Sequence, residues 1–226
     1  MNSCPVSSSK RLYTASLIFS GAVFALFATA ALAWEDGAEL DVRFVRWVHH
    51  NAPAALVDAM RVLTYLGSAE VLAALAVAAA VVFVRRGLPR AAVFVLIAFV
   101  ASEALDQLLK VLFRRARPSL EDPFVRLATY SFPSGHAFAS TATYGALALV
   151  VVSALPRARP ALVAAATAIL VTIVAASRVV LGAHYLLDVV AGIAAGIALL
   201  SALLLAFRGR VDARREEQPE RARLDS

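Results

Sequence analysis

The chain has 226 residues, of which 61% are hydrophobic and only 17% are charged. Its mean hydropathy is +0.75, whereas an ordinary soluble domain is about 45–50% apolar and about 25% charged. A soluble protein of this size would retain too little polar surface to face water. The composition therefore excludes a typical soluble enzyme, a disordered protein and a disulfide scaffold, and it favours a helical protein that crosses a membrane several times.

The formal net charge of +6 comes from lysines and arginines that form short clusters between apolar runs. This pattern fits loops at a membrane surface better than a nucleic-acid-binding face. The one cysteine, Cys4, cannot form an intramolecular disulfide. We therefore expect the lipid bilayer, and not nucleic acid, as the partner.

A helix that crosses about 30 Å of hydrocarbon needs about 20 apolar residues. Six segments reach or approach this length: Leu12–Ala33, Ala69–Val84, Ala91–Phe113, His136–Leu155, Ala161–Ala176 and Tyr185–Phe207. The first segment could be a signal peptide, but it is longer than the usual signal core of about 7–15 residues, so we expect an uncleaved span. The sequence predicts an all-α fold, a six-transmembrane helix bundle.

The connection Trp34–Ser68 between the first two spans mixes apolar and charged residues. We expect it to form interfacial helices, with Trp34 and Trp47 as aromatic anchors at the membrane surface. The adjacent His49 and His50 could suggest a metal or proton site, but on such a helix we interpret them as ordinary polar residues.

The chain is thus divided into an N-terminal tail (1–11), an integral membrane domain (12–207) and a disordered C-terminal tail (208–226). With both tails in the cytoplasm, the cytoplasmic side carries 13 lysines and arginines and the opposite side carries nine. Because cytoplasmic loops are enriched in these residues, we expect this orientation, in an inner or plasma membrane.

Ionisable residues within or at the rim of a span are costly and indicate function. Four clusters qualify: Lys110 to Arg117 after the third span, Ser131 to His136 before the fourth, Ser177-Arg178 at the end of the fifth, and His184 to Asp188 at the start of the sixth. In a six-span bundle all four lie on one side of the membrane. The topology therefore predicts that two basic clusters and two histidines converge at one rim, the extracytoplasmic one.

The cations and the helix start suit a phosphoryl group. Arg117 and Arg178 offer planar forks, and Lys110 offers a point charge. Ser134 and Gly135 lie where the free N–H groups of a helix start bind anions. Each residue alone has a simpler interpretation, such as a lysine that extends toward the interface, so the prediction depends on the combination.

The two histidines suit acid–base and covalent chemistry. His184 and Asp188 are four residues apart and share one helical face if the helix starts early enough. Asp188 can then hold the Nδ1 proton and leave Nε2 of His184 as a nucleophile, while His136 serves as general acid.

Other ionisable residues near the rim receive less specific interpretations. We expect Arg114, Arg115 and Arg126 to contact lipid headgroups. Glu103 and Asp106 lie seven and four residues before Lys110, and we expect them to be inward-facing partners that hold the third span in register.

Taken together, the clusters resemble a known family. Lys110-x6-Arg117-Pro118, then Pro133-Ser134-Gly135-His136, then Ser177-Arg178-x5-His184-x3-Asp188 is similar to the three-part signature of the type-2 phosphatidic acid phosphatase and vanadium haloperoxidase superfamily. The resemblance covers about 55–207. One departure is Ser119, where many members carry another arginine. The composition favours the membrane lipid phosphatase branch of the superfamily over its soluble haloperoxidase branch.

The resemblance implies a role for each residue. It implies that His184 attacks phosphorus, that Asp188 orients it and that His136 protonates the leaving oxygen. It also implies that the phosphate is held by Lys110, Arg117, Ser134, Gly135 and Arg178. These implied roles agree with the interpretation of the residues themselves.

The function indicated is hydrolysis of a membrane lipid phosphate or diphosphate, of the phosphatidate, phosphatidylglycerophosphate or undecaprenyl diphosphate type. The alternatives are a phosphatase or phosphotransferase for a soluble phosphoester and a non-catalytic lipid-binding or transport protein. We expect no metal and no other cofactor, because three cations and helix-end N–H groups already neutralise the phosphate. Glu121 and Asp122 are expected to pair with neighbouring arginines.

Overall fold

The structure, a computed structural model, describes residues 5–32, 35–120, 124–125, 127–155 and 157–224, with side chains described from residue 10, from residue 39 after the first gap, and up to residue 207. The helices in chain order are α1 (Pro5–Leu32), α2 (Glu35–Asn51), α3 (Ala54–Leu63), the 3₁₀ turn η1 (Thr64–Gly67), α4 (Ala69–Arg85), α5 (Pro89–Phe113), α6 (Gly135–Ala154), α7 (Pro160–Val180) and α8 (Leu186–Leu224). Trp34, Glu121, Asp122 and Arg126 lie outside the described residues.

Five helices in the described ranges are long and apolar enough to cross a membrane. A sixth span results if the segments Ala54–Gly67 and Ala69–Arg85, which meet at an angle of 45°, are counted together. The all-α prediction with six spans is therefore confirmed, with a bent second span. The bend falls at Ser68, between η1 and α4.

Two helices differ from their predicted spans at their ends. The fifth span was predicted to end at Ala176, but α7 continues to Val180, so Arg178 belongs to the helix. The last helix runs to Leu224, and its part that could span a membrane is Leu186–Phe207. The division of the chain into a membrane domain and two tails stays a prediction.

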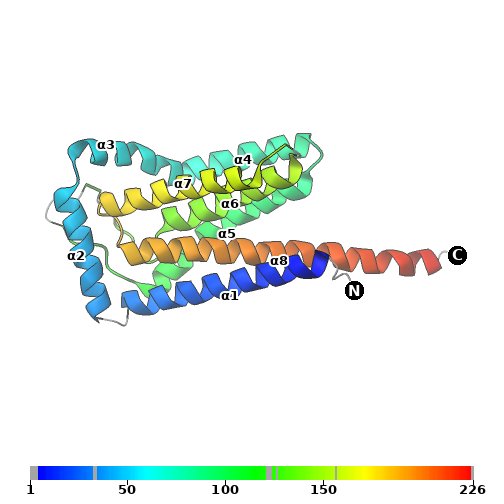
Figure 1. The fold of residues 1–226 in the computed structure, drawn as a ribbon, viewed down its shortest axis with the longest axis horizontal. Coiled ribbons are helices and arrows are strands. Elements are labelled where there is room, and N and C mark those ends of the chain that lie inside the picture. Colours follow the sequence, from blue (N-terminus) through cyan, green and yellow to red (C-terminus); the bar gives the residue numbers. More distant parts are fainter. Residues whose placement is uncertain (1–4, 33–34, 121–123, 126, 156, 225–226) are drawn as a thin grey trace.

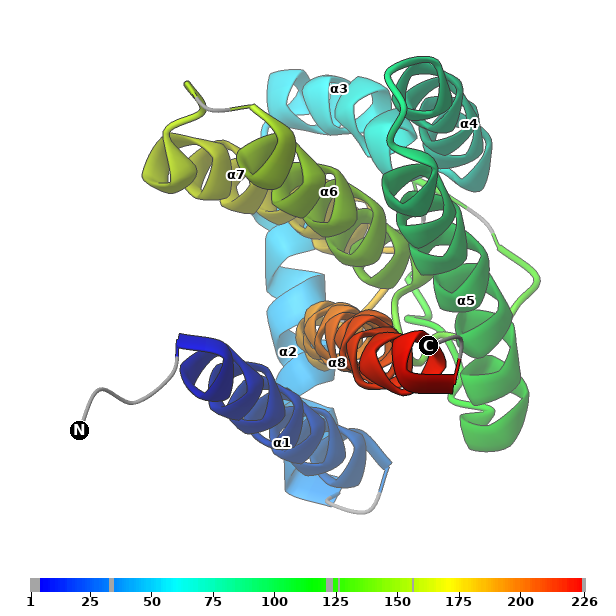
Figure 2. The same ribbon diagram turned by 90° about the vertical axis from the view of Figure 1, so that its right-hand side faces the viewer.

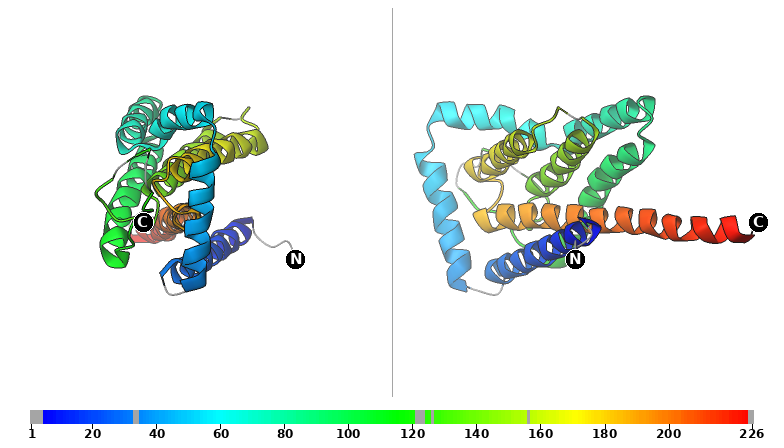
Figure 3. Two further views of the ribbon diagram at one scale, coloured as in Figure 1. Left: turned by 90° about the vertical axis from the view of Figure 1, so that its left-hand side faces the viewer. Right: turned by 45° about the vertical axis from the view of Figure 1, so that its right-hand side comes forward.

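The long helices lie side by side, and α2 lies across one end of them (Figure 1). The N-terminus of the chain is at the opposite end, where α8 extends beyond the bundle (Figures 1 and 3). Viewed along the bundle, α8 lies between α1 and the remaining helices (Figure 2), and it packs against both α1 and α6. The helix α2 thus covers the end at which α6 and α8 begin.

Two glycines allow α8 to approach the start of α6 closely. A Cβ atom on Gly192 would lie 2.6 Å from the Ser134 carbonyl oxygen, and one on Gly196 would lie 2.5 Å from the Thr141 side chain. Neither distance is possible for a real side chain without displacement of the helices. This packing brings the cluster at the start of α8 against the cluster at the start of α6.

Candidate active site

The predicted site residues gather at the end of the bundle that α2 covers. They come from the end of α5 (Lys110), the following loop (Arg117), the start of α6 (Ser134, Gly135 and His136), the end of α7 (Arg178), the α7–α8 turn (His184) and the first turn of α8 (Asp188). Most of these side chains are buried, including every charged one except that of Arg117, which is partly exposed. The structure therefore brings all eight together, as the topology predicted.

His184 is placed by the turn that ends α7. Gly182 adopts a left-handed conformation (φ 68°), its N–H donates to the Val179 carbonyl, and the Ala183 N–H donates to the Arg178 carbonyl. This pair of hydrogen bonds is the Schellman motif that commonly ends a helix with glycine. The chain reverses there, so that His184 lies buried directly beneath the end of α7 that carries Arg178.

Asp188 is fixed by the start of α8. The helix begins at Leu186, so His184 precedes it and the two residues do not share a helical face, contrary to the expected geometry. Asp188 occupies the third helical position, and its Oδ2 accepts a hydrogen bond from the Tyr185 N–H at 3.0 Å. This is one half of a capping box, and the turn it forms still brings His184 against Asp188. Oδ2 also accepts a hydrogen bond from the Ser131 hydroxyl.

The contacts of His184 define which ring nitrogen is free to react. Nδ1 lies 3.5 Å from Asp188 Oδ2 and has no hydrogen-bond partner among the described residues. Nε2 lies 3.1 Å from the Arg117 guanidinium, which can only donate. Nε2 is therefore the acceptor, the proton belongs on Nδ1, and Nδ1 faces the Asp188 carboxylate.

The Arg117 guanidinium donates hydrogen bonds to several groups of the protein itself. Its guanidinium donates to the carbonyls of Thr129, Tyr130 and Ala183, to the Thr129 hydroxyl and to His184 Nε2. These contacts use all five of its N–H groups. A phosphoryl oxygen that binds Arg117 must therefore replace one of these contacts, and replacement of the His184 contact would expose Nε2 at the same moment.

Lys110 is paired in the absence of a ligand. Its Nζ lies 2.5 Å from Asp106 Oδ2, one turn earlier on α5. This agrees with the expectation that Asp106 is an inward-facing partner of Lys110. The same carboxylate would lie 2.7 Å from a Cβ on Gly135, so an anionic group already occupies the space beside the first residue of α6. That position is electrostatically suited to anions.

Besides His184 Nδ1, two buried polar groups of the site lack partners among the described residues. Arg178 donates from one terminal nitrogen to the Thr64 hydroxyl of η1 at 2.7 Å, but its Nε–H is unpaired, as is the Ser134 hydroxyl. Unpaired buried polar groups are costly, so their clustering indicates a place for a polar ligand. His136, at the second position of α6, lies within electrostatic reach of Arg178 and His184.

Burial lowers the pKa of His184 to about 4; Arg117 and Arg178 act in the same direction as burial, whereas the Asp188 carboxylate opposes it. A nucleophilic imidazole must be neutral, so kcat/KM is expected to fall as the pH drops through about 4, and not near the ordinary histidine value of about 6.5. The measurement uses two phosphoesters with different ionisation constants, because a limb common to both belongs to the protein. A common limb near 6.5 would contradict this assignment.

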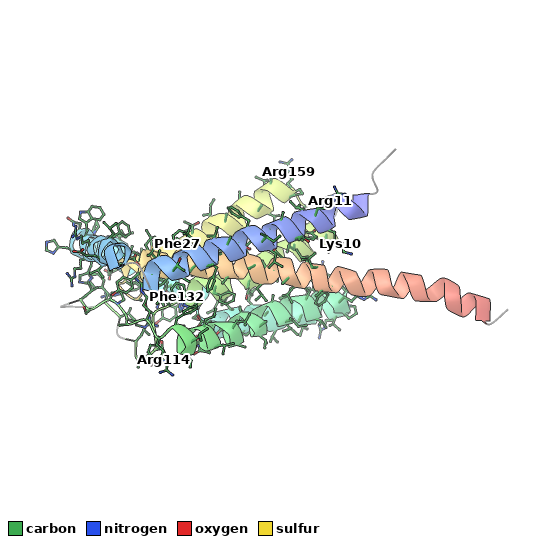
Figure 4. The ribbon with its side chains drawn as sticks, turned by 90° about the horizontal axis from the view of Figure 1, so that it is seen from below. Lys10, Arg11, Phe27, Arg114, Phe132 and Arg159 are labelled. Carbon is green, nitrogen blue, oxygen red and sulfur yellow. The ribbon has the colours of Figure 1, made fainter. Side chains whose placement is uncertain are left out.

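Sequence reasoning did not place two residues that contact the site. Arg115 was expected to contact lipid headgroups, and this is wrong: its side chain is only 8% exposed and bridges Asp188 and Asp41. Arg114, by contrast, is exposed at the rim of the bundle (Figure 4). Asp41 was considered only as part of an interfacial segment, because nothing local in that segment indicates a buried carboxylate.

A multi-pass helical bundle that gathers two histidines and three phosphate-suited cations at one end, with His184, Lys110 and Arg178 buried, is the arrangement of a membrane phosphatase. Comparison with known proteins agrees: residues 91–212 match the PAP2 superfamily. The chain is 30% identical over 148 residues to phosphatidylglycerophosphatase B of Bacillus subtilis, covering 64% of this chain and 71% of that protein. The chain therefore belongs to the PAP2 superfamily, in its membrane lipid phosphatase branch, and is a phosphoric monoester hydrolase.

Solved structures support the same assignment of the fold. The crystal structure of a transmembrane PAP2-type phosphatidylglycerolphosphate phosphatase from Bacillus subtilis superimposes with a TM-score of 0.80 at 25% identity, over 87% of this chain and 97% of that one. The structure of LpxE from Aquifex aeolicus superimposes with a TM-score of 0.60 at 23% identity, over 73% and 94% of the two chains. This second likeness concerns the fold alone.

Proposed function

We propose that the protein hydrolyses the terminal phosphate of a membrane lipid, with phosphatidylglycerophosphate as its first candidate substrate, through a phosphohistidine at His184. The observation that carries the proposal is the His184 environment: a buried imidazole whose Nε2 faces Arg117 and whose Nδ1 faces Asp188. The Bacillus relatives, whose names state phosphatidylglycerophosphate as substrate, support the choice of lipid.

The proposed reaction has two steps. In the first, Nε2 of His184 attacks phosphorus, the P–O bond to the lipid breaks, and His136 gives its proton to the leaving oxygen. Lys110, Arg117 and Arg178 compensate the charge of the transferring phosphoryl group, and Ser134 and Gly135 bind it at the start of α6. In the second, His136 takes a proton from water, the water oxygen attacks the phosphohistidine, and inorganic phosphate leaves.

Asp188 has a supporting role in this scheme. When Nε2 forms the bond to phosphorus, the imidazole becomes cationic, and the carboxylate facing Nδ1 stabilises that charge. The positive charges of Lys110, Arg117 and Arg178 stabilise the negative charge of the phosphoryl group in the same way. Together with one water molecule, these side chains account for both steps of the proposed reaction.

A panel of substrates tests the proposal. Detergent-solubilised protein is assayed for phosphate release from phosphatidylglycerophosphate, phosphatidate, undecaprenyl diphosphate and glycerol 3-phosphate. The expected result is the highest kcat/KM with phosphatidylglycerophosphate and at least about a 100-fold lower value with the soluble ester, since the membrane-embedded site selects a lipid. Equal turnover of glycerol 3-phosphate would favour a soluble substrate, and preference for either other lipid would replace the first candidate.

The orientation of the site can be tested separately. Lys10, Arg11 and Arg159 lie at the end of the bundle opposite Arg114 (Figure 4), in agreement with cytoplasmic termini and an extracytoplasmic site. In a Cys4→Ser background, Ser119→Cys, at an exposed position beside the site, should react with a membrane-impermeant thiol reagent in intact cells or spheroplasts. Arg86→Cys, at the other end of the bundle, should react only after permeabilisation. The reverse pattern would invert the orientation.

A further inference from the structure

We propose that Asp41 and Arg115 are positioning residues that hold the Asp188 carboxylate against His184 and thereby connect α2 to the reaction. Asp41 lies outside the four clusters that indicated the site, and Arg115, although it lies between Lys110 and Arg117, was expected to contact lipid headgroups. The inference rests on the proposed phosphohistidine mechanism, in which Asp188 stabilises the charged imidazole.

Arg115 joins two buried carboxylates. One terminal nitrogen lies 2.5 Å from Asp188 Oδ1 and the other lies 3.0 Å from Asp41 Oδ2. The side chains of Arg115, Asp41 and Asp188 are 8%, 2% and 0% exposed. The guanidinium also lies over the Tyr185 ring, 4.2 Å from its centroid. A planar fork can contact two carboxylates and an aromatic face at once, which a lysine cannot do.

Asp41 fixes the other side of the same arrangement. Its Oδ1 accepts hydrogen bonds from the N–H groups of Leu186 and Leu187, at 2.9 and 3.3 Å. These are the first two residues of α8, whose N–H groups have no partner within the helix. A carboxylate from α2 thus caps the helix on which Asp188 lies.

Apolar packing of α2 against α7 accompanies this contact. Val45, one turn after Asp41, is fully buried and packs with Ala175 and Val179 of α7. The helix α2 therefore packs against the end of α7 and the start of α8, which flank the turn that contains His184. Position and orientation of the Asp41 carboxylate follow from this packing.

The two oxygens of Asp188 have separate partners. Arg115 contacts Oδ1, whereas Tyr185 N–H, the Ser131 hydroxyl and the His184 ring are all on the side of Oδ2. Arg115 therefore prevents the carboxylate from rotating away from His184. The Arg115 carbonyl also accepts the Ser131 N–H at 2.8 Å, so the same residue positions a second partner of Oδ2.

If the ion pairs of Arg115 only stabilised the fold, their removal would have a different effect on labelling. Removing one partner of a buried pair destabilises a protein whatever its activity, and this would reduce the number of folded sites. Loss of positioning instead slows phosphoryl transfer at sites that still bind substrate, because a misplacement of about 1 Å can cost about 100-fold in rate. The amplitude and the rate of phosphohistidine formation separate the two effects.

The experiment compares Arg115→Lys, Arg115→Gln and Asp41→Asn with the wild-type protein in detergent, using ³²P-labelled phosphatidylglycerophosphate and single turnovers quenched with alkaline SDS, in which phosphohistidine is stable. We expect Arg115→Gln to reduce the rate of His184 labelling about 100-fold and Arg115→Lys and Asp41→Asn about 10-fold. KM should stay within about threefold, because Lys110, Arg117 and Arg178 are untouched. The labelling amplitude per folded protein should stay near that of the wild type.

Two variants control for charge removal. Arg43→Gln removes an exposed arginine that pairs with Glu39 on α2, and Asp58→Asn removes an exposed carboxylate that pairs with Arg61 on α3. Both should label at the wild-type rate. A labelling rate within twofold of wild type in Arg115→Gln would overturn the inference, and so would a reduced amplitude with an unchanged rate. A wild-type protein that never forms phosphohistidine would instead refute the proposed function.

Discussion

Replacement of His184 by alanine is expected to lower phosphate release by at least about 10⁴-fold, since loss of a nucleophile that acts with its partners as one unit has effects of this size or larger. Nε2 of this buried imidazole is the acceptor in its contact with Arg117, and we assign it the attack on phosphorus. The measurement is labelling with a lipid that carries ³²P in its terminal phosphate, quenched with alkaline SDS because phosphohistidine is stable in alkali, and the wild-type protein should retain label whereas His184→Ala should not.

Two further variants sharpen this test. His50→Ala changes an exposed histidine on α2 and should retain both label and turnover. His136→Ala, assayed with an ester whose leaving group needs no protonation, should form the label but lose it slowly, because His136 also activates the water of the second step. Label of wild-type intensity in His184→Ala would refute the assignment of the nucleophile.

The convergence of the site could be predicted because it follows from topology. Once six spans are assumed, Lys110, Ser134, Arg178 and His184 must lie at one end of the bundle, whatever the detailed packing. The membrane spans could also be predicted, because the length of an apolar segment is a strong signal. The end of α7 was misplaced because the predicted span followed the apolar run, which stops before Ser177 and Arg178, whereas the helix continues through them to Val180.

The contacts that hold the site residues in place could not be predicted in the same way. Whether Arg115 contacts lipid or a carboxylate depends on how α2 crosses the end of the bundle, and this is set by tertiary packing. Asp41 is separated from Asp188 by most of the chain, and its local pattern is that of an amphipathic helix. Likewise, the five engaged N–H groups of Arg117 depend on carbonyls of the loop at Thr129 and Tyr130, whose path no local motif specifies.

The contact between Arg117 and His184 has a consequence for inhibition. In the free site, the guanidinium covers the nucleophilic nitrogen. An oxyanion that binds Arg117 replaces this contact and meets Nε2 in the same position. A trigonal-bipyramidal oxyanion such as vanadate can bond to Nε2 while the cations hold its equatorial oxygens, so it should compete strongly with the lipid phosphate.

Activity is therefore expected to survive exhaustive chelation with EDTA and to fall at least about tenfold with orthovanadate. Lys110, Arg117 and Arg178 and the start of α6 already provide the charge compensation that a divalent cation would give a phosphoryl group. Among the side chains that the structure describes, no group of three or more His, Cys, Asp or Glu is placed to hold a metal ion. Asp188, the carboxylate nearest His184, is engaged by Arg115 and Ser131.

The measurement is turnover of phosphatidylglycerophosphate in detergent before and after chelation, with and without orthovanadate. Glu121 and Asp122 lie outside the described residues; they follow Arg117 by four and five positions in the sequence and are the strongest sequence candidates for metal-binding carboxylates. The variant Glu121→Gln/Asp122→Asn should keep the turnover of the wild type, because neither residue has a role in the proposed mechanism. Activity that disappears on chelation and returns with Mg²⁺, and that this variant also lacks, would replace the metal-free mechanism with one that uses both carboxylates.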